Sequence, residues 1–301
     1  MQFCEKVNHQ FSKSLLPRRD DTGNKGSFGT LLSICGARDM PGAALLSGQA
    51  ALRCGVGLLA LAGPESVRRA AAVVLPEAVQ LPMEENREGL MTAEYYERSI
   101  AGYTRAKAIL FGCGIGRGAS VGGILTRLLN RDSRPMVIDA DGLFALQQSN
   151  PRAVFDRPVV LTPHMGEMAR LTGRDIPYIK EHRADCARAL ARGKNAVVVL
   201  KDHITLIAAP DGRTWLLEAP NSGMAKGGSG DVLAGCIASF LAQGLPAEQA
   251  ACLGVWIHSR AGALAARKYG RTAMLPRDIL ESIPSAILEL ESPDTFCETN
   301  I

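Results

Sequence analysis

The sequence lacks the features of several large classes of protein. No segment approaches the ~20 consecutive apolar residues that a membrane-spanning helix needs, and the N-terminus carries no apolar stretch of the signal-peptide type. The 34 basic and 30 acidic residues are spread along the chain without a long basic run, which argues against a nucleic-acid-binding protein. We therefore expect a cytoplasmic protein that binds neither a membrane nor nucleic acid.

The eight cysteines show no pairing in the sequence. None belongs to a Cys-x-x-Cys motif, and several lie within apolar stretches. This pattern predicts free, mostly buried thiols in a reducing compartment, not a disulfide framework or a zinc site. The sequence also has no Walker-type phosphate loop, no His-Glu-x-x-His metal motif and no Gly-x-Ser-x-Gly nucleophile motif.

Aromatic residues are scarce, at 5% of the 301 positions, whereas hydrophobic residues as a whole make up 47%. A chain rich in Ala, Leu, Val and Gly suits a parallel sheet closely covered by helices better than an aromatic-rich sandwich. Short apolar runs alternate with longer amphipathic ones, which is the pattern of repeated β-α-β units. We predict an α/β fold with a central, mostly parallel sheet flanked by helices on both faces.

The predicted elements form one domain. Strands are expected at residues 30–35, 58–62, 108–111, 136–139, 159–161, 196–200, 204–208 and 214–217. Long helices are expected at residues 42–53, 231–243, 247–269 and 276–288. Residues 1–24 are polar and are predicted to form an irregular N-terminal arm, residues 25–290 the domain, and residues 291–301 a tail.

The segment from Asn221 to Asp231 carries the clearest chemical signal. Gly227, Gly228 and Gly230 directly precede an apolar helix, and Asp231 lies in its first turn. Glycines let backbone N–H groups face a ligand, and a helix N-terminus adds unpaired donors and partial positive charge. Asp231 could be a helix cap or a general base. The density of glycines favours an anion-binding site in which Asp231 is the base.

Other polar residues follow predicted strands, at the edge where open sheets bind ligands. The loop after residue 161 contains His164 and Glu167; a function is favoured for His164, whereas Glu167 could equally cap the next helix. Asp139 and Asp141 end another strand. They could hold a metal or a phosphate-bound cation, or they could cap a helix and form a turn.

Two further segments give weaker signals. The Gly-Cys-Gly-Ile-Gly stretch at 112–116 permits close backbone approach to a ligand, but it is not a complete dinucleotide-binding fingerprint. We interpret Cys113 as a small residue in a tight turn, because no histidine adjoins it in the sequence. Lys201 could bind a nucleotide phosphate as a point charge, or it could be an edge-strand lysine that discourages aggregation. His203, taken alone, is expected at the surface.

Taken together, these motifs resemble the ADP/ATP-dependent NAD(P)H-hydrate dehydratases, a repair-enzyme family with a ribokinase-like fold. The resemblance extends from Asn24 to about Ile279. Related sugar and vitamin kinases share the Gly-Gly-Ser-Gly-Asp element, whereas the Thr-Pro-His-x-Gly-Glu loop at 162–167 and the Lys-Gly-Ser-Phe-Gly segment at 25–29 narrow the match to the dehydratases. The resemblance implies phosphorylation of the S epimer of hydrated NADH or NADPH by ADP or ATP, followed by elimination of phosphate.

The resemblance also implies residue roles, a cofactor and partners. The implied catalytic residues are Asp231 as the base, with Gly228 and Gly230 around the transferred phosphoryl group. The implied contacts of the hydrated dinucleotide are Ala43, Gly114, His164 and Asp231. The implied contacts of the adenine nucleotide are Lys201, Asp202, His203, Ile204, Thr205 and Gly230. Mg²⁺ would assist, the enzyme would be a homotetramer, and the epimerase for the hydrate would be a separate protein.

Three positions depart from the pattern that is usual in this family. Asn24 stands where His is usual, Met165 where Pro is usual, and Asp202 where Gly is usual. These departures concern fine nucleotide contacts, not the class of reaction. The alternatives are a small-molecule kinase of the same fold, acting on a thiazole or pyrimidine alcohol, and a nucleotide-binding module without turnover. The intact Asp231 after an intact glycine cluster argues against the second alternative.

Overall fold

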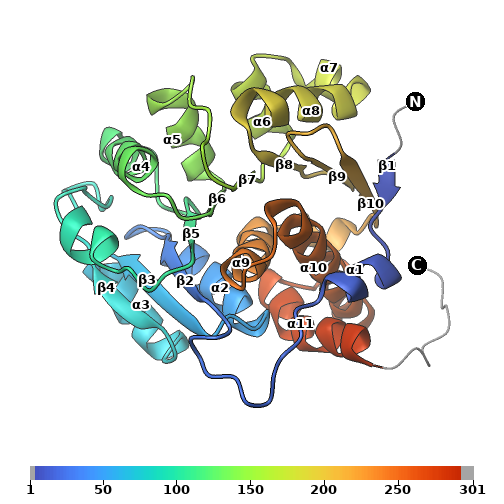
Figure 1. The fold of residues 1–301 in the computed structure, drawn as a ribbon, viewed down its shortest axis with the longest axis horizontal. Helices are drawn as coiled ribbons and strands as arrows, with labels where there is room; N and C mark the ends of the chain where they lie inside the picture. Colours follow the sequence, from blue (N-terminus) through green and yellow to red (C-terminus); the bar gives the residue numbers. More distant parts are fainter. Residues whose placement is uncertain (1–3, 293–301) are drawn as a thin grey trace.

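Ten strands form one sheet through the centre of the molecule (Figure 1). The structure is a computed structural model that describes residues 4–292. In sheet order the strands are β1 (Cys4–Lys6), β10 (Thr214–Glu218), β9 (Ile204–Ala208), β8 (Val197–Leu200), β7 (Val159–Leu161), β6 (Met136–Ile138), β5 (Ala108–Phe111), β2 (Thr30–Ile34), β3 (Leu58–Gly63) and β4 (Val79–Pro82). All neighbours run parallel except that β9 is antiparallel to β8 and β10. The predicted mostly parallel sheet is confirmed.

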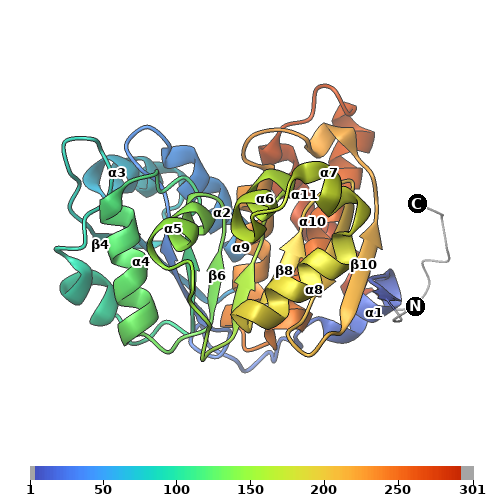
Figure 2. The ribbon, with the colours of Figure 1, turned by 90° about the horizontal axis from the view of Figure 1, so that it is seen from above.

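Helices cover both faces of the sheet. One face carries α1 (His9–Leu15), α2 (Pro41–Arg53), α3 (Glu65–Val74), α9 (Ser229–Ala242), α10 (Ala247–Tyr269) and α11 (Pro276–Glu291). The other face, nearer the viewer in Figure 2, carries α4 (Ala119–Arg131), α5 (Asp141–Ser149), α6 (Met165–Thr172), α7 (Ile176–Glu181) and α8 (Arg183–Lys194). A π-helix, η1 (Tyr96–Ala101), and a 3-10 helix, η2 (Ser222–Met224), complete the described elements. Leu31 and Leu32 of β2 enter different cores, because successive strand residues point to opposite faces.

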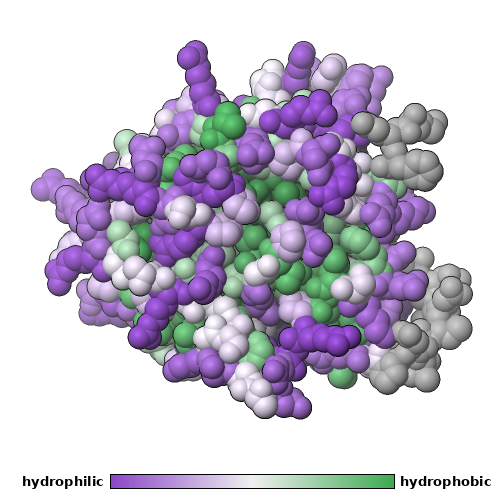
Figure 3. Space-filling model, in the orientation of Figure 1, coloured by the Kyte–Doolittle hydropathy of each residue, from purple (hydrophilic) through white to green (hydrophobic). Residues whose placement is uncertain are grey.

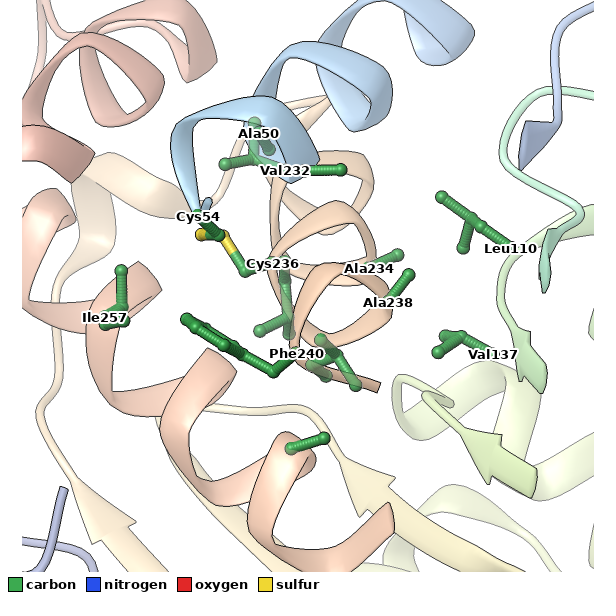
Figure 4. Close-up of a cluster of buried hydrophobic side chains, with 14 of the residues drawn as sticks. Ala50, Cys54, Leu110, Val137, Val232, Ala234, Cys236, Ala238, Phe240 and Ile257 are labelled. Atoms are coloured by element: carbon green, nitrogen blue, oxygen red, sulfur yellow. The ribbon is translucent and has the colours of Figure 1, made fainter. Parts of the chain in front are cut away.

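The small and apolar residues of helix α9 determine where it packs. Every residue from 232 to 242 is buried, and Figure 4 shows Ala234 and Ala238 facing β5 and β6. Gly235 lets α2 pack very closely, because a Cβ there would lie 2.1 Å from the main-chain oxygen of Ser47. Small residues on both sides therefore hold α9 against the sheet, which fixes the position of its N-terminus beyond the carboxyl ends of the strands.

The N-terminal segment is more regular than its sequence predicts, which corrects the expectation of an irregular arm. β1 extends the sheet beside β10, and the Trp215 Nε1–H donates to Glu5 Oε2 at 2.9 Å. Helix α1 begins after Asn8, whose side chain accepts a hydrogen bond from the Phe11 N–H. A three-residue strand is too short to show a hydrophobic period, so its neighbour β10 determines its conformation. Most of the predicted C-terminal tail lies outside the described residues.

Within residues 4–292, no helix combines the length and the apolar character that crossing a membrane requires. In the view of Figure 3, hydrophilic side chains occupy most of the outline and hydrophobic ones reach the surface mainly toward the centre. The seven described cysteines are free thiols, and all of them except Cys4 are buried. Cys297 lies outside the described residues.

Candidate active site

The glycine segment forms an open turn at the N-terminus of α9. Gly228 precedes the helix with φ +100°, a left-handed conformation that other residues rarely adopt. A Cβ on Gly228 would also lie 2.7 Å from Leu46 Cδ1. A Cβ on Gly227, by contrast, would meet no protein atom within 4 Å. The fold therefore requires a glycine at 228, whereas the space beside Gly227 is open to a ligand.

Asp231 is a partly buried carboxyl group with a shifted pKa. Burial is the main cause and the nearby charge of Asp139 the next, and together they raise the pKa of Asp231 to about 6 against the lowering influence of Cys113 and Lys201. Side-chain atoms of Asp231, Asp139 and Cys113 all lie within 4.8 Å of one another. A carboxyl group that titrates near neutrality can both accept and release a proton at the pH of a cell. The geometry therefore supports the predicted general base.

The neighbouring Asp139 is held by protein groups mainly through one of its oxygens. The residue is 1% exposed, and its Oδ1 accepts hydrogen bonds from Lys201 Nζ at 2.8 Å and Thr162 Oγ1 at 2.5 Å. Its Oδ2 is approached by the Cys113 thiol at 3.8 Å. Burial alone would lower the pKa of Lys201, but the charge and hydrogen bond of Asp139 together with the charge of Glu167 raise that pKa. The edge-strand interpretation of Lys201 is wrong, since the preceding strand β8 pairs with β7 and β9 on its two sides.

Asp141 has different partners from Asp139, although only one residue separates them. Ala140 has φ +50°, which is uncommon for a residue other than glycine, and this bend directs the two carboxylates apart. Asp141 accepts hydrogen bonds from the Gly116 N–H at 3.0 Å and from Arg117 Nε at 2.8 Å. Asp141 thus lies in the first turn of α5 and holds the glycine turn at 112–116. No side chain caps the start of α5, so the turn interpretation holds for Asp141 and the capping one does not.

His164 and Glu167 form a capping box at the start of α6. The His164 Nδ1 accepts hydrogen bonds from the Gly166 and Glu167 N–H groups at 3.0 and 3.4 Å, and Glu167 Oε2 accepts from the His164 N–H at 2.9 Å. An accepting Nδ1 places the ring proton on Nε2, which lies 3.3 Å from Glu167 Oε1. Burial lowers the pKa of His164. The ring is therefore a neutral group of fixed orientation, and Glu167 has the capping role.

A pocket of about 750 Å³ adjoins these groups, a size typical of small-molecule sites. It brings together six of the predicted site residues: His164, Lys201, Asp202, His203, Thr205 and Gly230. Ala43, Gly114, Ile204, Gly228 and Asp231 are not among its lining residues.

The second group of predicted residues lies beside this pocket. Ala43 and Gly114 are neighbours, because a Cβ on Gly114 would lie 2.5 Å from Ala43 Cβ. Cys113 joins them to Asp231, which in turn follows the pocket residue Gly230. Asp231 thus adjoins both groups of residues, the one around Ala43 and Gly114 and the one that lines the pocket.

Sequence reasoning assigned no role to three residues of this region, although Ser229 and Lys226 lie within the glycine segment that it singled out. The Ser229 Oγ lies 3.3 Å from the His258 Nε2, and burial lowers the pKa of His258 to about 4, so the ring is neutral. No sequence signal connects a histidine in the middle of α10 with this turn. Lys226 also lines the pocket, and its place directly before the glycine pair is a signal that could have identified it.

The sequence is similar to proteins of one family over most of its length. The family model for NAD(P)H-hydrate dehydratase matches residues 31–285. An ADP-dependent (S)-NAD(P)H-hydrate dehydratase of Xanthomonas campestris is 36% identical over 88% of this chain and 90% of that protein. The Bacillus subtilis enzyme of the same name is 34% identical, over 90% of this chain and 94% of that protein.

A bifunctional NAD(P)H-hydrate repair enzyme of Moorella thermoacetica is 38% identical over 93% of this chain. The chain spans about half the length of this relative, 53%, and 54% of the length of the bifunctional NAD(P)H-hydrate repair enzyme of Thermofilum pendens.

Solved structures agree with the sequence comparison. The Bacillus subtilis ADP/ATP-dependent NAD(P)H-hydrate dehydratase, co-crystallised with ATP/Mg²⁺, superimposes with a TM-score of 0.83 at 30% identity, over 96% of this chain and all of that chain. A ribokinase-like superfamily protein of Enterococcus faecalis gives a TM-score of 0.83 at 26% identity, over 97% of this chain and 98% of that chain, which confirms the predicted fold class. A hydroxyethylthiazole kinase of Pyrococcus horikoshii, with a TM-score of 0.58 at 14% identity, shares the fold alone.

Proposed function

The chain belongs to the NAD(P)H-hydrate dehydratase family, and on that basis we propose that it dehydrates the S epimer of hydrated NADH and NADPH with ADP or ATP as phosphoryl donor. The products would be NADH or NADPH, inorganic phosphate, and AMP or ADP. One observation carries the proposal at the level of residues. A partly buried carboxyl group with a pKa of about 6, that of Asp231, lies where an open glycine turn meets a ligand-sized pocket.

The reaction needs a base and an anion-binding turn, and the chain has both. Asp231 would take the proton of the C6 hydroxyl as that oxygen attacks the terminal phosphoryl group of the nucleotide. The P–O bond to the nucleotide breaks, and AMP or ADP leaves. The resulting phosphate ester is a good leaving group, so loss of phosphate from C6 and of a proton from the adjacent ring carbon restores the dihydronicotinamide. N–H groups of the turn that contains Gly228 and Gly230 would hold the phosphoryl oxygens.

The two groups of residues fit the two substrates of this reaction. The pocket residues Lys201, Asp202, His203, Thr205 and Gly230, with Ile204 between them in the chain, would hold the adenine nucleotide. Ala43 and Gly114, together with the pocket residue His164, would contact the hydrated dinucleotide, and Asp231 adjoins both sets. The identity and coverage of the dehydratase relatives make the small-molecule kinase alternative the weaker one.

Mg²⁺ would arrive with the nucleotide, because the acidic residues of the site do not fit a resident magnesium ion. The Asp139 carboxylate is paired with Lys201, and Asp141 is bound by Arg117. The described side chains that could hold a metal together are Asp139, Asp231 and Cys113. The sulfur of Cys113 does not suit Mg²⁺, which prefers oxygen ligands in near-octahedral geometry. The Mg²⁺ that assists the reaction would thus be held mainly by the phosphate groups.

The test of this function is recovery of absorbance at 340 nm when the protein is mixed with hydrated NADH, Mg²⁺ and ADP or ATP. We expect nucleotide-dependent recovery with release of phosphate, and a loss of ~10²-fold or more in the Asp231→Asn variant. A variant that keeps a tenth of the wild-type rate would contradict the role of Asp231. Turnover of a thiazole or pyrimidine alcohol to a stable phosphate, without recovery of NADH, would identify the protein as a kinase.

The assembly and location of the protein belong to the same proposal. We infer a cytoplasmic homotetramer from the resemblance to the dehydratases. Light scattering coupled to size-exclusion chromatography measures the assembly directly, and a mass of one or two chains would contradict the tetramer.

A further inference from the structure

Lys226 occupies an unusual position in the pocket. It lies between η2 and the glycine turn, and it lines the pocket beside Gly227, Ser229 and Gly230. Its ammonium group donates hydrogen bonds to two main-chain carbonyl oxygens, those of Thr272 at 2.8 Å and Met274 at 2.6 Å. Both acceptors belong to the connection between α10 and α11. Lys226 therefore links the glycine turn to that connection.

The charge of Lys226 is not compensated by a carboxylate. Within the described part of the chain, no Asp or Glu oxygen lies within 4.0 Å of its Nζ. The other lysine that lines the pocket, Lys201, is paired with Asp139 at 2.8 Å. The pocket carboxylate of Asp202 is paired with Arg183 at 2.6 Å. Among the described lining residues, Lys226 therefore contributes the one lysine charge without an ionic partner.

The two carbonyl contacts leave one donor for a ligand. A lysine ammonium has three N–H groups, and the contacts with Thr272 and Met274 use two. Ordering a free lysine side chain costs conformational entropy, and here the two carbonyl contacts already order it. Carbonyl groups hold the ammonium without neutralising its charge, and the residue lines the pocket beside the turn. A preorganised cation of this kind is suited to an anionic ligand.

We propose that Lys226 binds the phosphate chain of the adenine nucleotide, with its third N–H as the donor and the carbonyls of Thr272 and Met274 as its anchor. The inference rests on the proposed function for the identity of the ligand, but it concerns binding and not turnover. It gives Lys226 a phosphate contact of the kind that the sequence offered as one of two alternatives for Lys201. Charge-assisted hydrogen bonds to phosphate are among the stronger polar contacts in proteins, so this residue would contribute substantially to nucleotide affinity.

The experiment compares two ligands, ADP and adenosine, by calorimetric titration of the wild-type protein and the Lys226→Gln variant. Glutamine keeps N–H donors for the two carbonyls but removes the charge. Because a hydrogen bond to a charged group contributes about 1.5–3 kcal/mol, we expect ADP affinity to fall about 10- to 100-fold, with adenosine affinity unchanged. Lys180→Gln, which removes an exposed charge from α7, is the matched control and should leave both affinities as they are.

Two outcomes would overturn the proposal. In the first, Lys226→Gln binds ADP within twofold of the wild type. In the second, ADP and adenosine weaken equally, which would show that Lys226 shapes the pocket and does not contact phosphate. If wild-type protein binds ADP in this way but fails to dehydrate hydrated NADH, the inference about Lys226 stands and the proposed reaction fails.

A second measurement needs no variant and so does not depend on how Lys226→Gln folds. Acetylation of wild-type lysines is followed by mass spectrometry of the peptides, with ADP, with adenosine and without ligand. We expect ADP to slow the acetylation of Lys226 and adenosine to leave it unchanged, with Lys180 as the internal reference. Equal rates at Lys226 with and without ADP would overturn the proposal.

Discussion

At the scale of single residues, the site is a set of buried charges that influence one another. Asp139 is bonded to Lys201 and Thr162 at short distance and almost fully buried, so its charge is held in place. Its field acts on Asp231, whose pKa burial has already raised. Two carboxyl groups close together with one paired cation are a common way to bring one pKa toward neutrality. This arrangement gives two predictions.

The first concerns the stability of an Asp231→Asn variant. The pKa of Asp231 is about 6 in the folded protein against 3.8 for the ordinary side chain, so the folded state holds the proton more tightly. The stability that the raised pKa of Asp231 contributes is complete below pH 3.8 and is lost as the pH rises through 6. By pH 8 the wild type has lost about 3 kcal/mol of folding stability in this way. Asparagine removes the effect, so calorimetry should show the variant melting several degrees above the wild type at pH 8, and this advantage should shrink at pH 5. An equal difference at both pH values would contradict the shifted pKa.

The second concerns the pH dependence of turnover. Asp231 accepts a proton only when it is ionised, so kcat/KM should rise with pH through about 6. The Asp139→Asn variant lacks the negative charge that raises the pKa of Asp231, and in it Lys201 has no carboxylate partner. The midpoint of the pH profile of kcat/KM should therefore move to lower pH. Because an unpaired buried Lys201 is destabilising, the double variant Asp139→Asn, Lys201→Met provides a check on folding. An unchanged midpoint in variants that fold would exclude Asp139 as an influence on the base.

At the scale of elements, the chemistry depends on where one helix begins. Helix α9 is packed by small residues against α2 and the sheet, so its N-terminus is fixed relative to the pocket. The preceding glycines have different tasks. Gly228 is required by its backbone conformation and by Leu46, whereas Gly227 faces open space. A substitution at Gly228 therefore tests the conformation and packing of the turn, whereas a substitution at Gly227 tests whether a ligand approaches it.

The prediction for this element compares Gly227→Ala with Gly228→Ala. The first adds a methyl group that touches no protein atom, so the free energy of unfolding should stay within ~0.5 kcal/mol of wild type. If phosphate approaches the turn, this methyl group blocks it, and ADP affinity should fall at least about tenfold, or ~1.4 kcal/mol. The second forces a left-handed alanine and should cost about 1–2 kcal/mol of stability or more. Chemical denaturation and ADP titration measure both effects, and unchanged ADP binding in Gly227→Ala would place the phosphates elsewhere.

At the scale of the whole molecule, the N-terminal segment completes the sheet. β1 covers the open side of β10, and the His9 and Trp256 rings meet edge to face with centroids 5.7 Å apart. Val7 is buried between these elements and donates its N–H to the Leu216 carbonyl. An uncovered strand edge presents unpaired N–H and C=O groups, which promote self-association. The segment thus has a structural role outside the site.

Removal of residues 1–16 tests this role. The shortened protein should melt several degrees lower and should associate more, because β10 becomes the edge of the sheet and the environment of Trp215 opens. ADP affinity should change little, since none of the residues that line the pocket belongs to this segment. Calorimetry, light scattering and nucleotide titration check the three parts. A shortened protein as stable as the full chain would show that β1 contributes nothing to stability.

Much of the fold was determined by local sequence pattern. The strands at 108–111, 159–161 and 204–208 and the helix at 247–269 occur at the predicted residues. Their apolar runs have the length and periodicity of one kind of element. The sequence also located Asp231 and the glycine turn, because a cluster of glycines before an apolar helix has few other uses. β1 and α1 were not predicted, because a neighbouring strand and a helix pair stabilise them and their own composition does not indicate them.

The partners of the charged residues were decided only by tertiary structure. The sequence left Asp139 and Asp141 equivalent, and a single bend at Ala140 gives one to Lys201 and the other to Arg117. It likewise left Lys201 as either a phosphate-binding cation or an edge-strand lysine, whereas in the structure Lys201 pairs with a carboxylate that lies 62 residues away along the chain. A hydrogen bond between distant residues leaves no local pattern, because the sheet order that creates it is a property of the whole chain. For the same reason no local pattern shows that Lys226 lacks a carboxylate partner, because the tertiary structure decides which carboxylates lie near it.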